Sequence, residues 1–237
     1  MVERPTAVIL AGGRGSRLQP YTSEIPKPLV TVGDRPIIEI LLRTLGKHNI
    51  TNIRIAVNHL AHLIMSALGD GSDLGMTISY SREREALSTV GPLTLMSDLP
   101  ENFLVVNGDI LTDLDYNRLL AHHLDQGTKL TVATCRRENR IDYGVIETDP
   151  VGLVTGFREK PSYDFTVSAG VYVFSRSILD HVPARERFGF DDLMHLLLEQ
   201  QEAIATYPHD GYWRDIGRPE DYAQVNTELA IIEDLLR

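Results

Sequence analysis

A glycine-rich segment near the start of the chain has the residue types of an anion-binding loop. It follows the apolar run TAVIL and reads Leu10, Ala11, Gly12, Gly13, Arg14, Gly15, Ser16 and Arg17. Glycines let the backbone turn sharply and present N–H groups to an anion, and the two arginines add fixed positive charge. The segment has no Gly-Lys-Ser/Thr ending, and Leu18 stands where a dinucleotide fingerprint needs a glycine. A plain tight turn explains a lone glycine cluster equally well.

A lysine between two prolines strengthens the anion-binding interpretation. Lys27 stands between Pro26 and Pro28. Proline fixes its own φ and disfavours helix in the residue before it, so we expect Lys27 on a stiff, extended segment. A solvated lysine does not need such rigidity. The alternative is a proline-rich surface turn that happens to contain a lysine.

The two segments together resemble the sugar-1-phosphate nucleotidylyltransferases, also called sugar nucleotide pyrophosphorylases. The family usually shows G-x-G-T-R-L-x-P-x-T followed by a P-K-P-like segment, and this chain reads LAGGRGSRLQPYT and then PKPL, with Ser16 where threonine is usual. The resemblance implies a nucleotide cradled by the loop from Leu10 to Ser16. It also implies Arg17 and Lys27 as catalytic cations that act on its phosphates.

Two aspartates match the metal ligands of that family. Asp109 follows the apolar run FLVV and the residues Asn107 and Gly108, which the resemblance places beside the nucleotide. A carboxylate there suits magnesium, a hard cation that prefers oxygen ligands. Taken alone, Asn-Gly-Asp is better explained as a turn. Asp215, in YWRDIG, resembles the second ligand, and its alternative role is to cap the turn into the last helix.

The sugar-phosphate side of the family is matched by three segments in the second half of the chain. The residues concerned are Tyr143, Gly144, Glu159, Lys160, Ser168 and Val171. In the family interpretation Glu159 accepts hydrogen bonds from sugar hydroxyls and Lys160 neutralises the sugar phosphate. The alternative for Glu159 and Lys160 is a solvated charged turn. Ser168 departs from the asparagine usual in the family, which alters a sugar contact or leaves room for water.

The base is suggested by the segment REREALSTVGPL, which resembles the base-reading segment of the family. Glu83 occupies a position where members using uracil or thymine often carry glutamine. A carboxylate accepts the two donors on the Watson–Crick edge of guanine and opposes a pyrimidine carbonyl, which favours GTP. Ser88 stands where the family has a glycine against the base. The alternative makes Glu83 a solvated charge and Ser88 the N-cap of the next helix.

The resemblance therefore implies a magnesium-assisted in-line transfer of a nucleotidyl group from a nucleoside triphosphate, with GTP favoured, to a sugar 1-phosphate of mannose or heptose type. The alternative within this class is a uridylyl- or thymidylyltransferase that acts on glucose 1-phosphate or an amino sugar phosphate. A non-catalytic sugar-nucleotide-binding subunit is a third interpretation, disfavoured because Arg17, Lys27 and both aspartates are present. A Rossmann dehydrogenase is disfavoured by the incomplete fingerprint.

The composition is consistent with these ligands. The 237 residues carry 23 basic and 33 acidic side chains, a net charge of −10, which argues against nucleic acid or an anionic membrane as a partner. A single cysteine, Cys135, excludes a disulfide framework and is expected to be a small core residue. Neither a membrane helix nor a secretory signal is recognisable, so a cytoplasmic location is expected.

The elements that must position these residues alternate between strand and helix. Apolar strand-like runs are predicted at 6–10, 53–57, 76–81, 103–106 and 130–135, with helices at 36–48, 59–68, 90–96, 116–124 and 190–200. Shorter strands are predicted at 144–148, 154–157 and 169–174, and one helix is predicted from Pro219 to Leu236.

This pattern predicts an α/β fold: a single doubly wound, mostly parallel, Rossmann-like sheet flanked by helices, with an irregular C-terminal half. We expect one nucleotidyltransferase domain over 1–237. Its nucleotide-binding part covers about 1–110 and its sugar-phosphate-binding part about 111–237. No hexapeptide repeat is recognisable, so a C-terminal β-helix domain is not expected. The oligomeric state is not readable.

Overall fold

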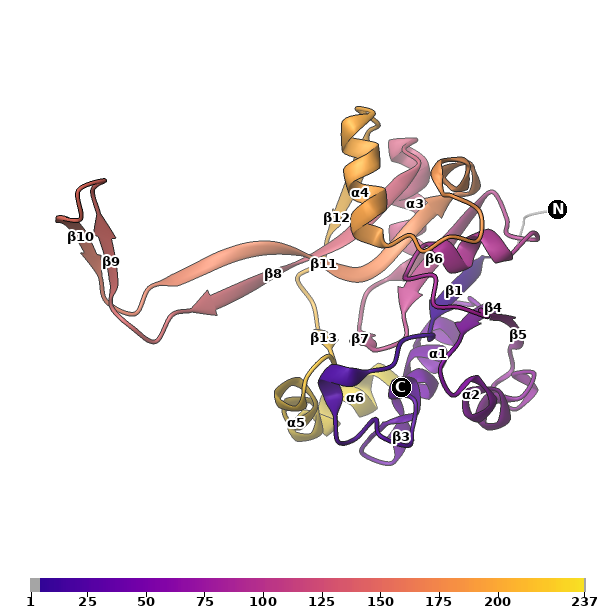
Figure 1. Ribbon diagram of the computed structural model, residues 1–237. Coiled ribbons are helices and arrows are strands. Elements are labelled where there is room, and N and C mark those ends of the chain that lie inside the picture. Colours follow the sequence, from indigo (N-terminus) through magenta and orange to yellow (C-terminus); the bar gives the residue numbers. More distant parts are fainter. Residues whose placement is uncertain (1–4, 237) are drawn as a thin grey trace.

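The computed structural model describes residues 5–236 and is built on a seven-stranded sheet (Figure 1). Across the sheet the order is β12 (Ile204–Pro208), β8 (Leu130–Arg140), β11 (Ser162–Ser175), β6 (Asn102–Asn107), β1 (Thr6–Leu10), β4 (Asn52–Val57) and β5 (Thr77–Arg82). Strand β11 is antiparallel to both of its neighbours, and the other neighbouring pairs are parallel. The predicted mostly parallel α/β sheet is confirmed.

Both faces of the sheet are covered, because successive side chains of a strand point to opposite sides. On one face Ala7 and Ile9 pack against α1 (Ile37–Lys47), α2 (Ala61–Leu68) and α3 (Tyr116–Gln126). On the other face Val8 belongs to a cluster with α4 (Phe190–Glu199) and the short 3₁₀ helix Gly91–Leu95. The central strands are therefore buried on both sides, as their continuous apolar sequences predicted.

Two helix predictions need correction. The segment around Val90 to Met96 forms the 3₁₀ helix Gly91–Leu95, with Pro92 in its first turn. The single C-terminal helix is wrong: α5 (Pro219–Thr227) and α6 (Leu229–Leu236) are separate helices. The chain turns at Glu228, whose carboxylate accepts hydrogen bonds from the guanidinium of Arg214 and the hydroxyl of Tyr212. The apolar residues of both helices still pack on α1 in a third cluster.

The second half of the chain forms an arm, defined as residues 135–167, that projects from the body (Figure 1). Residues 135–140 of β8 pair with residues 162–167 of β11 and continue beyond the sheet as a two-stranded ribbon. At its end lies a hairpin of β9 (Val145–Thr148) and β10 (Val154–Arg158). The sequence predicted β9 and β10, but it placed the start of β11 at residue 169 rather than at Ser162.

Two small pairings complete the structure. Strands β2 (Thr31–Val32) and β3 (Arg35–Pro36) form a short hairpin before α1. Strand β7 (Ile110–Thr112) follows β6 and pairs with β13 (Trp213–Asp215), which joins the C-terminal region to the edge of the sheet where β6 ends.

Within residues 5–236, no helix has both the length and the apolar character needed to cross a bilayer.

Candidate active site

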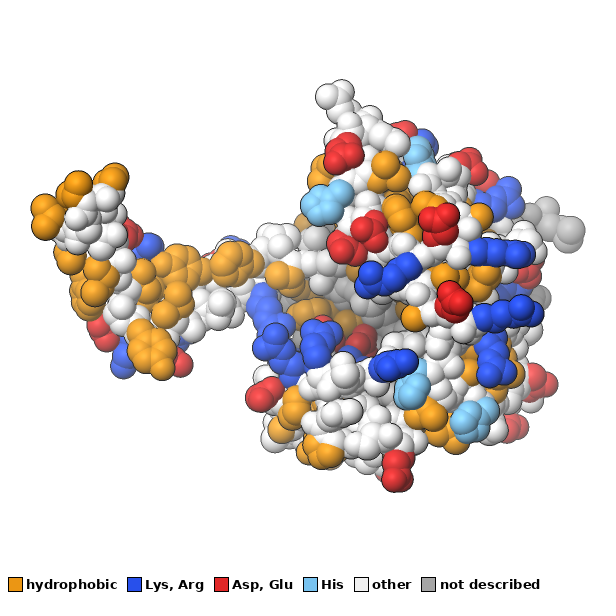
Figure 2. Space-filling view, in the orientation of Figure 1, with side chains coloured by type: hydrophobic (Ala, Val, Ile, Leu, Met, Phe, Trp, Pro, Cys, Tyr) orange, Lys and Arg blue, Asp and Glu red, His pale blue; other side chains and the backbone are white. Residues whose placement is uncertain are grey.

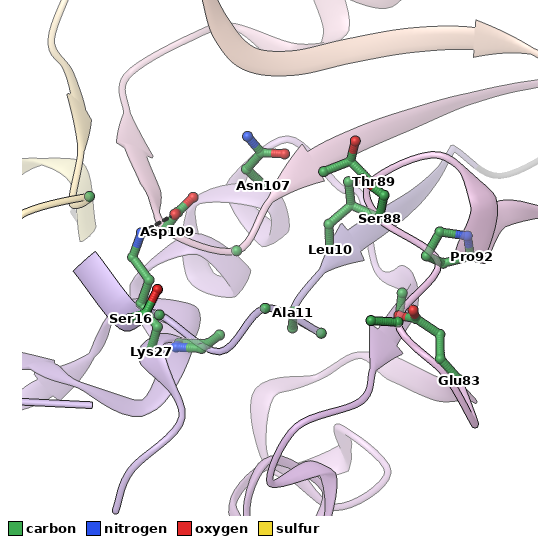
Figure 3. Close-up of a pocket in the computed structure, with 18 of the residues that line it drawn as sticks. Leu10, Ala11, Ser16, Lys27, Glu83, Ser88, Thr89, Pro92, Asn107 and Asp109 are labelled. Carbon is green, nitrogen blue, oxygen red and sulfur yellow. Dashed lines mark hydrogen bonds and ion pairs between the residues drawn. The ribbon is translucent and has the colours of Figure 1, made fainter. Parts of the chain in front are cut away.

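A cavity of about 380 Å³ lies at the carboxyl ends of β1 and β6, where ligands of open α/β sheets bind (Figure 3). The predicted nucleotide-binding residues that line it are Leu10, Ala11, Gly12, Gly13, Gly15, Ser16, Glu83, Ser88, Asn107 and Gly108. The predicted catalytic residues Arg17, Lys27 and Asp109 also line it. Arg14 is exposed and is not among the lining residues. Segments far apart in the sequence thus meet in one cavity.

Close backbone approach shapes the glycine-rich wall of the cavity. The Gly108 N–H donates to the Leu10 carbonyl, at 3.0 Å, which ties the end of β6 to the end of β1. A Cβ on Gly108 would lie 2.9 Å from that carbonyl oxygen. Gly15 has a φ of +63°, which disfavours a side chain, and its carbonyl accepts a hydrogen bond from the Thr22 hydroxyl. Glycine is therefore required at both positions for steric reasons.

Lys27 enters the cavity from a turn. Pro26 is extended, but Lys27 begins the 3₁₀ helix Lys27–Leu29, so the prediction of an extended Lys27 is wrong. The side chain is buried and its ammonium group pairs with the carboxylate of Asp109, as Figure 3 shows. A buried ammonium group without a partner would be costly, so this ion pair fixes where the lysine points.

Asp215 reaches Asp109 through the pairing of β7 with β13. Asp215 lies opposite Ile110, and the Ile216 N–H donates to the Asp109 carbonyl. The pKa of the Asp215 carboxyl is raised, first by burial and then by the negative charge of Asp109, while Lys27 and Arg17 act in the opposite direction. Two carboxylates and two cations therefore lie within electrostatic reach of one another. The alternative role of Asp215 as a helix cap is wrong, because α5 begins after Arg218.

The donor set of Asp109 and Asp215 fits a divalent cation. Both residues offer carboxylate oxygens, which Mg²⁺ prefers, and two neighbouring carboxylates in a half-buried place repel unless positive charge lies between them. Burial is the main cause of the raised pKa of Asp215, and the negative charge of Asp109 raises it further. No cluster of three or more His, Cys, Asp or Glu side chains suited to a metal occurs in residues 5–236. Further oxygen ligands would have to come from a bound phosphate or from water.

Glu83 and Ser88 lie at the end of the cavity opposite Lys27 and Asp109 (Figure 3). Glu83 is buried, so the alternative of a solvated charge is wrong. Its Oε2 accepts a hydrogen bond of 2.8 Å from the Leu87 N–H, and burial raises the pKa of the carboxyl. Ser88 has a φ of +68° and is not a helix cap, because the next 3₁₀ helix begins after Val90 without a side-chain cap.

The predicted sugar-phosphate residues do not reach the cavity. Tyr143, Gly144, Glu159 and Lys160 lie in the arm, between the ribbon and the hairpin, and are exposed. Glu159 and Lys160 thus occupy the solvated turn that was their alternative interpretation. Ser168 and Val171 lie in β11. The Ser168 hydroxyl donates to the Tyr172 hydroxyl, at 3.1 Å, and the Val171 side chain is buried in the core.

Sequence reasoning missed several lining residues. They are Pro28, Ala56, Ala86, Thr89, Pro92 and Gly217. Five of these, all but Ala56, stand in segments that resemble the family, so adjacency to the motifs was an available signal. Ala56 had none, since it is a small apolar residue within a strand. It lines the cavity because β4 is the neighbour of β1, with Ala56 beside Leu10.

Cys135 agrees with the structural role expected of it. Its side chain is buried at the start of the arm, and burial raises the pKa of the thiol to about 11. The thiol is therefore protonated at neutral pH and is a poor nucleophile.

Comparisons with known proteins agree with this geometry. A family profile described as "Nucleotidyl transferase" matches residues 6–231. The catalytic subunit beta of mannose-1-phosphate guanylyltransferase from Drosophila pseudoobscura pseudoobscura is 34% identical over 223 residues, covering 91% of this chain and 60% of that protein. A Synechocystis UTP–glucose-1-phosphate uridylyltransferase is 32% identical over 238 residues, covering 92% and 61%.

The chain thus spans about three fifths of the length of the curated relatives that it matches. Among solved structures, HddC from Yersinia pseudotuberculosis superposes with a TM-score of 0.76 at 26% identity, over 95% of this chain and 99% of that one. The resemblance recognised in the glycine-rich segment and the Pro-Lys-Pro turn is confirmed by these matches. The chain belongs to the nucleotidyl transferase family.

Proposed function

We propose that this protein transfers a nucleotidyl group from a nucleoside triphosphate to a sugar 1-phosphate, releasing pyrophosphate. The observation that carries the proposal is the convergence of Arg17, Lys27 and Asp109 on one cavity, with Asp215 beside them. The similarity to proteins named guanylyltransferase and uridylyltransferase supports it.

In the proposed reaction an oxygen of the sugar phosphate attacks the α-phosphorus. A new P–O bond forms there, and the bond from the α-phosphorus to the bridging oxygen breaks, with its electrons leaving on pyrophosphate. Both reactants are anions, so catalysis consists of alignment and charge neutralisation. The loop amides and Arg17 hold the phosphates that leave, and Lys27 neutralises charge on the α-phosphoryl group. Asp109 and Asp215 would hold Mg²⁺, which supplies further positive charge when it is bound.

The proposed nucleotide is GTP, and the proposed acceptor is mannose 1-phosphate or a heptose 1-phosphate. The buried carboxylate of Glu83 lines the end of the cavity away from Lys27, where a base would lie. One of its oxygens is engaged by Leu87, and the other is 2.7 Å from where a Cβ on Gly12 would stand. This oxygen faces the loop and is the candidate acceptor for a base N–H donor. The resemblance of this segment to guanylyltransferases supports GTP.

The test is pyrophosphate release with each of GTP, UTP, CTP, dTTP and ATP against a panel of sugar 1-phosphates. We expect turnover to be highest with GTP and a mannose- or heptose-type acceptor. A preference for UTP or dTTP would favour the uridylyl- or thymidylyltransferase alternative, which the Synechocystis relative supports. Nucleotide binding without turnover for any pair would favour a non-catalytic sugar-nucleotide-binding protein.

A further inference from the structure

Exposed apolar side chains gather at the end of the arm (Figure 2). Of the 14 large apolar side chains that are exposed in residues 5–236, six lie between residues 143 and 157. They are Tyr143, Ile146, Val151, Leu153, Val154 and Phe157, with exposed fractions from 58% to 80%. Soluble monomers rarely expose an apolar patch of this size, and such patches mark interaction sites.

The hairpin that carries this patch makes its interactions within the arm. Strands β9 and β10 pair with each other as a separate two-stranded sheet, in which Ile146 lies opposite Phe157. The ion pairs Arg158–Glu147 and Arg140–Asp142 join residues of the arm to one another. An isolated two-stranded hairpin is marginally stable in water at best. A partner surface that covers its apolar face would stabilise it.

The position of the arm connects this patch to the active site. Strand β11 is antiparallel to β6 and to β8, so β8 runs in the direction of β6 and leaves the sheet at the edge where the cavity lies. The ribbon of residues 135–140 and 162–167 extends roughly 20 Å beyond that edge, at about 3.3 Å per residue. Glu159 and Lys160 follow at its end. Among the described residues, none from 110 to 216 lines the cavity of its own chain.

We propose that a second copy of this chain covers the arm, and that each arm brings Glu159 and Lys160 to the cavity of the partner subunit. The proposal rests on the proposed function, because it completes the sugar-phosphate side of that site. With about 150–250 Å² for a large side chain and exposed fractions from 58% to 80%, the six apolar residues expose on the order of 700 Å². This is close to the ~800 Å² that one partner contributes to a standard interface.

The charge of the arm agrees with a second copy as its partner. Residues 135–167 contain five basic and six acidic side chains, whereas the whole chain has a net charge of −10. Two nearly neutral arms repel each other little, and a two-fold dimer places the same surface on both partners. If the two ribbons cross a two-fold axis at the edge of the sheet, each arm can reach the partner while its two strands stay paired. If an arm instead closed onto the cavity of its own chain, its paired strands would have to bend back on themselves.

The first test measures the mass of the full chain in solution by sedimentation and light scattering. We expect twice the 26.5 kDa of one chain. In the variant Ile146→Lys with Phe157→Glu, opposite charges face each other across the hairpin, which preserves its pairing while removing the apolar face. This variant should be monomeric. The matched control, Leu124→Lys with Leu198→Glu, changes two body leucines that are each 61% exposed and should stay dimeric. A monomeric parent chain would overturn the proposal.

The second test asks which chain supplies the arm. Two variants, Lys27→Met and Lys160→Met, are co-expressed with different affinity tags, and the mixed dimer is purified through both tags. Each parent dimer should be at least about 10-fold less active than the wild type. In the mixed dimer, one cavity with an intact Lys27 receives an arm with an intact Lys160, so we expect about half of the wild-type pyrophosphate release. Activity no higher than the parents would show that each arm serves its own cavity.

The two tests separate this proposal from the proposed function. If the wild type releases no pyrophosphate with any substrate pair, the proposed function fails, while the mass of the two variants still decides the interface. If the wild type is active but the mixed dimer is not restored, the arm proposal fails and the proposed function stands. Full activity of the Lys160→Met dimer would overturn the role of the arm in the site.

Discussion

The cavity and the arm hold their charged side chains in opposite ways. In the cavity, Lys27 is buried and paired with Asp109, and the backbone around them is tied to neighbouring strands. In the arm, the pair Arg158–Glu147 is about half exposed, and β9 and β10, which carry it, pair with each other as a separate two-stranded sheet. Geometry is therefore preorganised in the cavity, whereas the arm presents residues whose order depends on what they contact. Substitutions in the two regions should differ accordingly.

The largest expected effect is on catalysis in the cavity. Lys27→Met removes the cation that faces Asp109, and we expect kcat/KM to fall about 10²–10³-fold, the usual loss for one group that stabilises charge in the transition state. The measurement is pyrophosphate release under the best substrate pair. The control Lys129→Met removes a lysine that pairs with Glu202 far from the cavity and should change kcat/KM less than about 2-fold. Equal losses in both variants would contradict the role of Lys27.

The next effect is on packing and compares two glycines. Gly108→Ala places a Cβ 2.9 Å from the Leu10 carbonyl oxygen, which belongs to a central strand and cannot move, so we expect a loss of about 1–3 kcal/mol in the free energy of unfolding. Gly144→Ala meets the ring of Phe157 at 2.6 Å, but in the single chain this ring is exposed and can turn away, so for the monomer the loss should be under about 0.5 kcal/mol. Urea denaturation of both variants measures the difference. A loss in the free energy of unfolding that is larger for Gly144→Ala than for Gly108→Ala would show that Phe157 cannot turn away because the arm is packed.

These two regions also differ in how far the sequence predicted them. The cavity could be predicted because its motifs follow directly after apolar strands, and parallel strands end at the same edge of a sheet, which brings Gly13 and Asp109 together. The position of the arm could not be predicted in this way. The alternation of residues in VIET and VTGF indicates strands but does not say whether they pack on the body. The break at Glu228 was missed because the apolar spacing of the two helices is continuous across it.

A third prediction concerns the pH dependence of stability and involves a histidine in the body of the protein. His123 is buried, and burial, with a smaller contribution from His122, lowers the pKa of its imidazole to about 4. In the unfolded chain this imidazole binds a proton near pH 6.5, whereas in the folded chain it binds one only near pH 4. The free energy of unfolding therefore falls as the pH drops below about 6.5, and this loss is complete near pH 4. This group should lower the free energy of unfolding by about 2 kcal/mol between pH 7 and pH 5.

Urea denaturation of the wild type and of His123→Gln at several pH values checks the sign and size of this effect. The imidazole lies between Thr131, Asn102 and Ser175, so the variant loses stability at every pH, but its dependence on pH should be weaker. The control His122→Gln changes the neighbouring half-buried histidine and should nearly keep the slope of the wild type, because His122 makes only the smaller contribution to the lowered pKa of His123. An unchanged slope in His123→Gln would show that other groups account for the loss in acid.

The smallest expected effect compares an ion pair of the body with an ion pair of the arm. Glu228 accepts hydrogen bonds from both Arg214 and the Tyr212 hydroxyl and is mostly buried, so Glu228→Gln should cost about 1–2 kcal/mol in the free energy of unfolding. Glu147 is half exposed and forms an ion pair with Arg158, so Glu147→Gln should cost less than about 0.5 kcal/mol. Denaturation in low and high salt measures both, because salt screens the exposed pair more strongly than the buried one. A Glu147 effect that equals that of Glu228 and grows with protein concentration would place this ion pair inside the interface between two arms, since only a contact between copies depends on concentration.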